Sequence, residues 1–264
     1  MRLLFIGDVV GAAGRRMVLE HLPRLLEEYR IDFTVANGEN AANGFGLNRR
    51  CFAELRACGV DCFTMGNHTF DNKDIYSFID QEPSLIRPAN YPPGLPGRGW
   101  ASFEVAGGRL RVINLMGRIF MRPLDCPFRT LDSLLRADRE DPAGRPQWTL
   151  VDMHAEATSE KVALGWHADG QVSAVVGTHT HVATADGRVL ARGTGYVTDA
   201  GMTGPRDSVL GVDKDIILER FRTGFSPRFE TADGDLQFNS VLFDLRADGG
   251  CEQVERLDFW QPSL

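Results

Sequence analysis

The chain has 264 residues, of which 43% are hydrophobic and 25% charged, a composition typical of a folded soluble protein. Its formal net charge of −7 argues against a general nucleic-acid-binding surface, which would carry a basic face. No apolar run approaches the roughly 18–20 residues that span a bilayer, and the N-terminal apolar run ends at Asp8, too early for a signal peptide. Five cysteines without a CxxC pair indicate reduced thiols, so we expect a cytoplasmic protein without a membrane partner.

The first third of the chain alternates strand and helix patterns with short connections. The predicted elements are a strand at 2–8, a helix at 15–29, a strand at 32–40, a helix at 48–58, a strand at 60–68 and a helix near 72–80. This alternation is typical of βαβ units on a parallel sheet.

After a Pro/Gly-rich loop at 87–100 the pattern changes, and residues 100–117 predict two strands joined by a Gly-Gly turn. The later predictions are a helix at 130–138, a strand at 147–156, a helix at 159–169, a strand at 172–181, a helix at 212–221 and an antiparallel pair within 236–259. No repeat, low-complexity tract or linker interrupts the chain. We therefore expect a single domain over residues 1–264, with two sheets face to face and helices outside.

Short polar clusters follow five of the predicted strands. They are GDVVG with Asp8, NGEN with Glu39 and Asn40, GNHTF with Asn67 and His68, DMHAE with His154, and GTHTH with His179 and His181. Ligands bind beyond the carboxyl ends of strands in open α/β sheets, so we expect these side chains to converge on one site. His179 and His181 stand two residues apart, which would place both rings on the same side of an extended chain.

The residue types in these clusters indicate a metal site. Carboxylate, amide and imidazole groups without thiolate suit manganese, iron or zinc, and there are more of them than one ion needs. Two ions about 3.5–4 Å apart, bridged by one carboxylate, is the arrangement of hydrolytic two-metal sites, and Glu39 is the candidate bridge. Taken singly, Asp8 could cap the following helix, Asn37 and Asn43 could be turn residues, and His154 could be a hydrogen-bonded core histidine.

In this order the clusters resemble the motifs of the calcineurin-like metallophosphoesterases. Val10 replaces the histidine of the first motif, and Glu39 followed by Asn40 replaces the aspartate of the second. These departures resemble the YmdB-type subfamily, whose members begin IGDVVG and carry NGEN, GNHT and GTHTHV. The resemblance spans essentially the whole chain, and it implies a four-layer αββα sandwich of two mixed sheets flanked by helices. It also implies phosphodiesterase activity on 2′,3′-cyclic nucleotides.

The resemblance further implies a role for each residue. One metal ion would take Asp8, Glu39, Asn40 and His181, and the other would take Glu39, Asn67, His154 and His179. His68 is left free as the general acid, while a metal-bound hydroxide would attack phosphorus. The implied cofactors are two transition-metal ions per chain, iron or alternatively manganese, and no organic cofactor.

Two other functions stay open. A nucleotidase or other phosphomonoesterase would use the same metal pair, and a regulatory or RNA-linked protein could use the site for nucleotide sensing. A structural metal site is normally closed, so a free histidine beside surplus ligands favours an enzyme. We expect a small phosphodiester or nucleotide as partner and no direct binding of duplex nucleic acid, in a pocket walled by 41–48, 87–99 and 117–129. The sequence leaves open the physiological substrate, the native metal and the oligomeric state, which could be a homo-oligomer.

Overall fold

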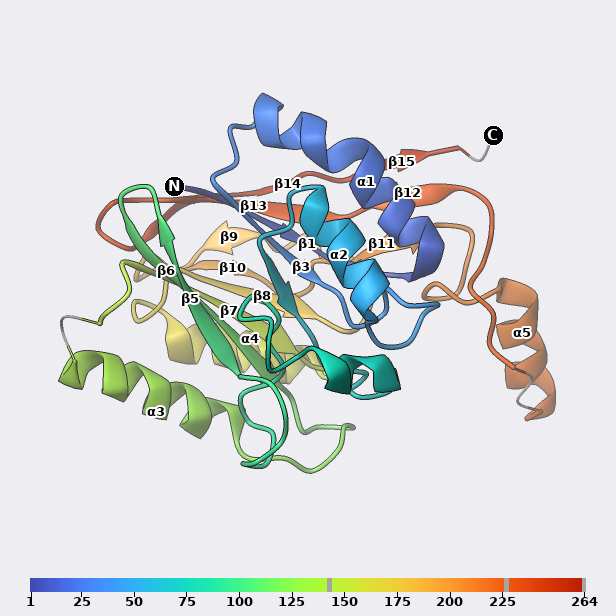
Figure 1. The fold of residues 1–264 in the computed structure, drawn as a ribbon, viewed down its shortest axis with the longest axis horizontal. Coiled ribbons are helices and arrows are strands. Elements are labelled where there is room, and N and C mark those ends of the chain that lie inside the picture. Colours follow the sequence, from blue (N-terminus) through green and yellow to red (C-terminus); the bar gives the residue numbers. More distant parts are fainter. Residues whose placement is uncertain (142–143, 226–227, 263–264) are drawn as a thin grey trace.

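The N-terminal third folds into the βαβ units that its alternating pattern predicts. The computed structural model describes residues 1–141, 144–225 and 228–262 (Figure 1). The first sheet contains the parallel strands β1 (Arg2–Ile6), β3 (Phe33–Asn37) and β4 (Cys62–Thr64), and the antiparallel strands β13 (Ser240–Leu245) and β14 (Cys251–Arg256). Their order is β14-β13-β1-β3-β4. Helices α1 (Gly11–Glu28) and α2 (Arg49–Ala57) cover its outer face.

The second sheet has four parallel strands with an antiparallel strand at each edge. Its order is β5 (Trp100–Val105), β6 (Gly108–Met116), β7 (Trp148–His154), β8 (Ala174–Thr178), β10 (Gly195–Val197) and β9 (Arg188–Val189). Helices α3 (Pro127–Glu140) and α4 (Thr158–Ala168) lie on the face away from the first sheet (Figure 1).

Three apolar layers hold these four layers of secondary structure together. Strand β1 shows why, because successive side chains of a strand point to opposite faces. Leu4 and Ile6 pack with the core beneath α1 and α2, whereas Leu3 and Phe5 pack between the two sheets. A third cluster, which includes Leu131 of α3, lies between the second sheet and its helices. The expected four-layer α/β sandwich with two mixed sheets is confirmed.

The structure also contains elements that the sequence pattern did not predict. A third sheet has the order β15 (Phe259–Gln261), β12 (Leu236–Phe238), β11 (Met202–Pro205) and β2 (Asp8–Val9). These strands have two to four residues, too few for a period-2 pattern to be visible. Helix α1 begins four residues earlier than expected, and the helix near 72–80 is the short 3-10 turn η1 (Lys73–Ser77).

Helix α5 (Lys214–Thr223) forms where a helix was expected and extends from the main body (Figure 1). It buries only one of its side chains, Ile217. No helix among the described residues is long and apolar enough to cross a bilayer.

Candidate metal centre

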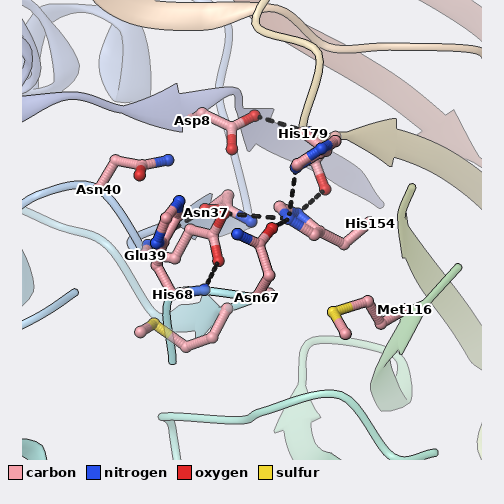
Figure 2. A network of polar contacts seen from close by, with 12 residues as sticks. Asp8, Asn37, Glu39, Asn40, Asn67, His68, Met116, His154 and His179 are labelled. Atoms are coloured by element: carbon pink, nitrogen blue, oxygen red, sulfur yellow. Dashed lines mark hydrogen bonds and ion pairs between the residues drawn. The ribbon is translucent and has the colours of Figure 1, made fainter. Parts of the chain in front are cut away.

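The carboxyl ends of parallel strands from both sheets meet at one edge of the sandwich. Figure 2 shows polar side chains from these ends pointing toward one another. Asp8 follows β1, Glu39 and Asn40 follow β3, Asn67 and His68 follow β4, His154 ends β7, and His179 and His181 follow β8. The structure therefore brings all eight residues together, although 173 positions separate the first from the last. The segment before Asn67 packs closely against His154, since a Cβ at Gly66 would lie 2.3 Å from the His154 ring.

The two histidines of GTHTH reach the site in a different way from the one expected. Strand β8 ends at Thr178, and His179 and His181 lie beyond it with φ angles of 97° and 63°. The period of an extended strand therefore does not apply to them, and the prediction of a strand that reaches residue 181 is wrong. His179 faces His154, whereas His181 faces Asn40.

Three side chains surround one atom, the Nε2 of His154. Glu39 Oε1 lies 3.0 Å from this atom, Asn67 Oδ1 2.9 Å and His179 Nδ1 3.1 Å. The candidate ligand atoms of Glu39, His154 and His179 all lie within 4.8 Å of one another. Such a mixed nitrogen and oxygen set suits a divalent transition-metal ion.

Asp8, Asn40 and His181 form a second group beside the first. Asn40 Nδ2 lies 3.2 Å from His181 Nε2, which lies 3.6 Å from Asp8 Oδ1. Asp8 Oδ1 is buried and accepts no hydrogen bond, and a buried carboxylate oxygen without a donor is costly unless a cation compensates it. Asp8 does not cap α1, whose N-cap is Val10 without a side-chain bond. The second group therefore also fits a cation.

Each of the three imidazoles is held by one ring nitrogen so that the other nitrogen faces the cluster. His154 Nδ1 lies 3.0 Å from Thr178 Oγ1, which donates to Asp152. In the same way, His179 Nε2 lies 3.0 Å from a Glu156 carboxylate oxygen, and His181 Nδ1 lies 3.0 Å from the backbone carbonyl oxygen of Leu210. Histidines that bind metals are oriented in this manner, with the outer N–H donated to an oxygen.

The charges in the cluster are strongly coupled. Burial would raise the pKa of Glu39, but the charge and hydrogen bond of His154 outweigh it and lower that pKa to about 2. Burial would lower the pKa of His154, but Glu39 and two further carboxylates raise it to about 9. Burial together with charged His154 lowers the pKa of His179 to about 3, so this ring keeps a free lone pair. Burial also raises the pKa of Asp8. Without metal, a proton on His154 offsets the charge of Glu39.

His68 lies beside the cluster, but its side chain is not one of those that surround His154 Nε2. Its backbone N–H donates to Glu39 Oε2 over 2.9 Å, and its Nδ1 lies 2.7 Å from Asp71 Oδ2. Its Nε2 makes no hydrogen bond to any described residue. The Phe45 ring packs edge-on against the imidazole, with centroids 5.1 Å apart. His68 is thus oriented on one side and free on the other.

A cavity of about 270 Å³ opens over these residues. Glu39, Asn40, His68, His179 and His181 are among the residues that line it. Its apolar wall contains Phe45, Leu210, Val212 and Phe229. Loop 41–48 therefore contributes as expected, but the lining includes segments 210–212 and 229–231 instead of loops 87–99 and 117–129. Only the tertiary structure reveals these lining segments, because the sequence around them carries no motif.

Several residues that orient the site were missed from the sequence. Asp152 stands two positions before His154 on β7, and Asp71 stands three positions after His68. Both spacings are visible signals, since they place the carboxylate on the same side of a strand or turn. Asn43 is a turn residue with a φ of 56°, as expected, whereas Asn37 is the last residue of β3, where its Oδ1 accepts from the Glu39 N–H at the start of the turn.

The four-layer fold and the paired ligand groups are those of a metallophosphoesterase. The chain belongs to the YmdB-like protein family, whose model matches residues 4–257. It is 52% identical over 245 residues to the 2′,3′-cyclic-nucleotide 2′-phosphodiesterase of Bacillus subtilis (strain 168), covering 93% of this chain and 91% of the relative. Divalent metal ions are implied by this family, and the cluster described above fits them.

Solved structures show the same fold. A hypothetical protein from Thermus thermophilus superposes with a TM-score of 0.93 at 45% identity and covers 99% of this chain and 100% of its own. A phosphatase from Mycoplasma pneumoniae gives a TM-score of 0.93 at 32% identity, covering 99% and 94%. A 5′-nucleotidase precursor, also from Thermus thermophilus, has a TM-score of 0.59 at 13% identity and covers 99% of this chain and 54% of its own, so it shares the fold alone.

We expect metal binding to release a proton from His154. The pKa of His154 is raised to about 9 in the metal-free protein, so the ring is charged below that pH and must lose its Nε2 proton to bind a metal. Apparent Mn²⁺ affinity should rise about tenfold per pH unit between 7.5 and 8.5 and level off near 9. Titration calorimetry in buffers of different ionisation enthalpy measures the released proton.

A His167→Ala variant serves as the control, because the His167 imidazole on α4 pairs with Asp132 of α3 and not with a candidate ligand. It should show the same pH dependence as the parent protein. An affinity that does not change between pH 7.5 and 8.5 would contradict this prediction.

Proposed function

We propose that the protein is a di-metal phosphodiesterase that hydrolyses 2′,3′-cyclic nucleotides or related small phosphodiesters. The observation that carries the proposal is the outward anchoring of three imidazoles, which leaves one nitrogen of each facing two buried carboxylates. The name of the Bacillus relative supports this substrate class. A histidine with a free Nε2 in the cavity wall supports catalysis over a closed structural site.

The two ligand groups support two ions, iron or alternatively manganese. One ion would be held by Asp8, Glu39, Asn40 and His181, and the other by Glu39, Asn67, His154 and His179. Half a turn of the Asn40 amide would present its oxygen, which is the atom that coordinates. Glu39 is the candidate bridge because its carboxylate has two oxygens that could each hold one ion, and Oε1 lies 3.0 Å from His154 Nε2.

The surroundings support a cytoplasmic, single-domain enzyme. All five cysteines are free thiols, as expected in a reducing compartment. Strand β1 at the N-terminus pairs with β13 near the C-terminus, so both ends of the chain build one sheet. We take residues 1–264 as one domain on this basis.

The chain's own residues divide the chemistry between them. When bound, divalent ions lower the pKa of a water molecule and neutralise charge on the phosphoryl oxygens. His68 donates a proton from Nε2 to the departing ribose oxygen, which is otherwise a poor leaving group. Asp71 holds Nδ1 and keeps Nε2 turned to the cavity. The apolar wall with Phe45 and Phe229 holds the nucleobase side of the substrate.

Metal content and substrate preference together test the proposal. Protein purified without added metal is analysed for elements, and hydrolysis of a 2′,3′-cyclic nucleotide is compared with that of the matching monoester. We expect close to two transition-metal ions per chain and cleavage of the cyclic diester. Cleavage of the monoester alone would replace the proposal by a nucleotidase, and no metal with no activity after adding Mn²⁺ or Fe²⁺ would reject it.

Replacing His68 separates proton donation from metal binding. General acids contribute roughly 10²–10⁴ in rate, so His68→Ala should lower kcat by about that factor while metal content stays unchanged. Glu39→Gln is the matched contrast, because it removes the charge shared by both ligand groups and should lose metal as well as activity. His68→Ala protein without metal would show that His68 is a ligand.

Replacing Phe45 tests whether the apolar wall binds the base. Stacking of a base on an aromatic ring is worth roughly 1–3 kcal/mol, so Phe45→Ala should raise KM for 2′,3′-cyclic AMP by about 5- to 150-fold. The KM for base-free ribose 2′,3′-cyclic phosphate should change little. Phe221→Ala, on an α5 ring that is 79% exposed, is the control. Equal losses on both substrates would place the base elsewhere.

A further inference from the structure

The loop that carries two of the candidate ligands has an unfavourable backbone. His179 and His181 have φ angles of 97° and 63°, in the left-handed region that side chains other than glycine rarely adopt. Such conformations persist only where the surrounding structure holds them in place. The residue between them, Thr180, is therefore the position at which an anchor would act on both imidazoles.

Asp199 supplies this anchor from the segment after β10. Its Oδ2 accepts hydrogen bonds from the Thr180 N–H over 3.2 Å and from the Thr180 hydroxyl over 2.6 Å. Its Oδ1 accepts from the Gly201 N–H over 2.8 Å. The carboxylate is fully buried, so its charge needs compensation inside the protein.

Lys161 of α4 provides the compensating charge. Its Nζ lies 2.7 Å from Asp199 Oδ2 and donates to the Thr178 carbonyl over 3.2 Å. Lys161 is only 1% exposed, an unusual position for a lysine and one that requires a partner. The strand beneath is packed closely, since a Cβ at Gly177 would lie 1.8 Å from the Thr198 carbonyl oxygen and 2.6 Å from Lys161 Cδ. The ion pair thus holds the chain on both sides of His179.

We propose that Lys161 and Asp199 are positioning residues of the metal centre, which fix the Thr178–Thr180 backbone so that His179 and His181 face separate ligand groups. The pair makes no hydrogen bond or ion pair to a candidate ligand side chain, and its hydrogen bonds hold the backbone at Thr178 and Thr180. The inference rests on the proposed function, because it concerns the orientation of ligands for the metals. It explains a buried ion pair that the proposed chemistry does not use.

The test is metal binding by a variant in which both charges are removed together, K161M/D199N. Removing both avoids leaving a single uncompensated charge in the interior. Loss of groups that orient metal ligands typically costs 10- to 100-fold in affinity, so we expect Co²⁺ binding to weaken by that factor in titration calorimetry. The visible absorption bands of bound Co²⁺ should shift, because they depend on ligand geometry. T180V, which removes only the hydroxyl bond to Asp199, should show a smaller loss in the same direction.

The matched control is R111M/D138N. This variant removes another buried ion pair, which joins β6 to α3 and touches no candidate ligand. It should bind Co²⁺ with the affinity and spectrum of the parent protein, even if it unfolds at a lower temperature. Parent-like affinity and spectrum in both K161M/D199N and T180V would overturn the inference, as would an equal loss in the control. In those cases the proposed function stands if the parent binds two ions; a parent that binds none rejects both.

Discussion

The contact between Glu39 and His154 is the interaction on which the site depends. It joins the turn after β3 in one sheet to the last residue of β7 in the other, at the edge where the sandwich would otherwise expose its apolar interior. Both side chains are almost completely buried, and neither charge would be tolerated alone. Where the two sheets meet, these opposite charges compensate each other, and a metal ion between the side chains would do the same.

The surroundings of this pair show how a fold prepares a metal site before the metal arrives. Thr178, Glu156 and the Leu210 carbonyl hold the outer nitrogens of the three imidazoles, while burial keeps His179 neutral and Asp8 Oδ1 without a donor. The metal-free cluster therefore uses a proton on His154 where the metal-loaded cluster would use a cation. Binding and proton release become one event for this reason.

The cavity beside the candidate metal ligands is built from the same strand ends together with segments from elsewhere in the chain. Because Glu39 Oε2 accepts from the backbone of His68, the carboxylate and the candidate proton donor have a fixed relation although they come from different strand ends. Besides Phe45, the apolar wall comes from a distant part of the chain, because residues 210–212 before α5 and 229–231 after it line the cavity. The candidate ligands thus come from the carboxyl ends of parallel strands in both sheets, and most of the apolar wall comes from the segments on either side of α5.

The sequence by itself determined the alternation of strands and helices, the two-sheet architecture and the eight polar residues at the strand ends. These are local properties, since an apolar run ending in GDVVG or GNHTF marks a strand and its carboxyl end without reference to any other segment. It did not determine the left-handed backbone at His179, the short strands of the third sheet, the cavity wall at Leu210 and Phe229, or the buried pair of Lys161 and Asp199. Those features depend on contacts between segments far apart in the chain, which no periodic pattern records, and only the tertiary structure decides them.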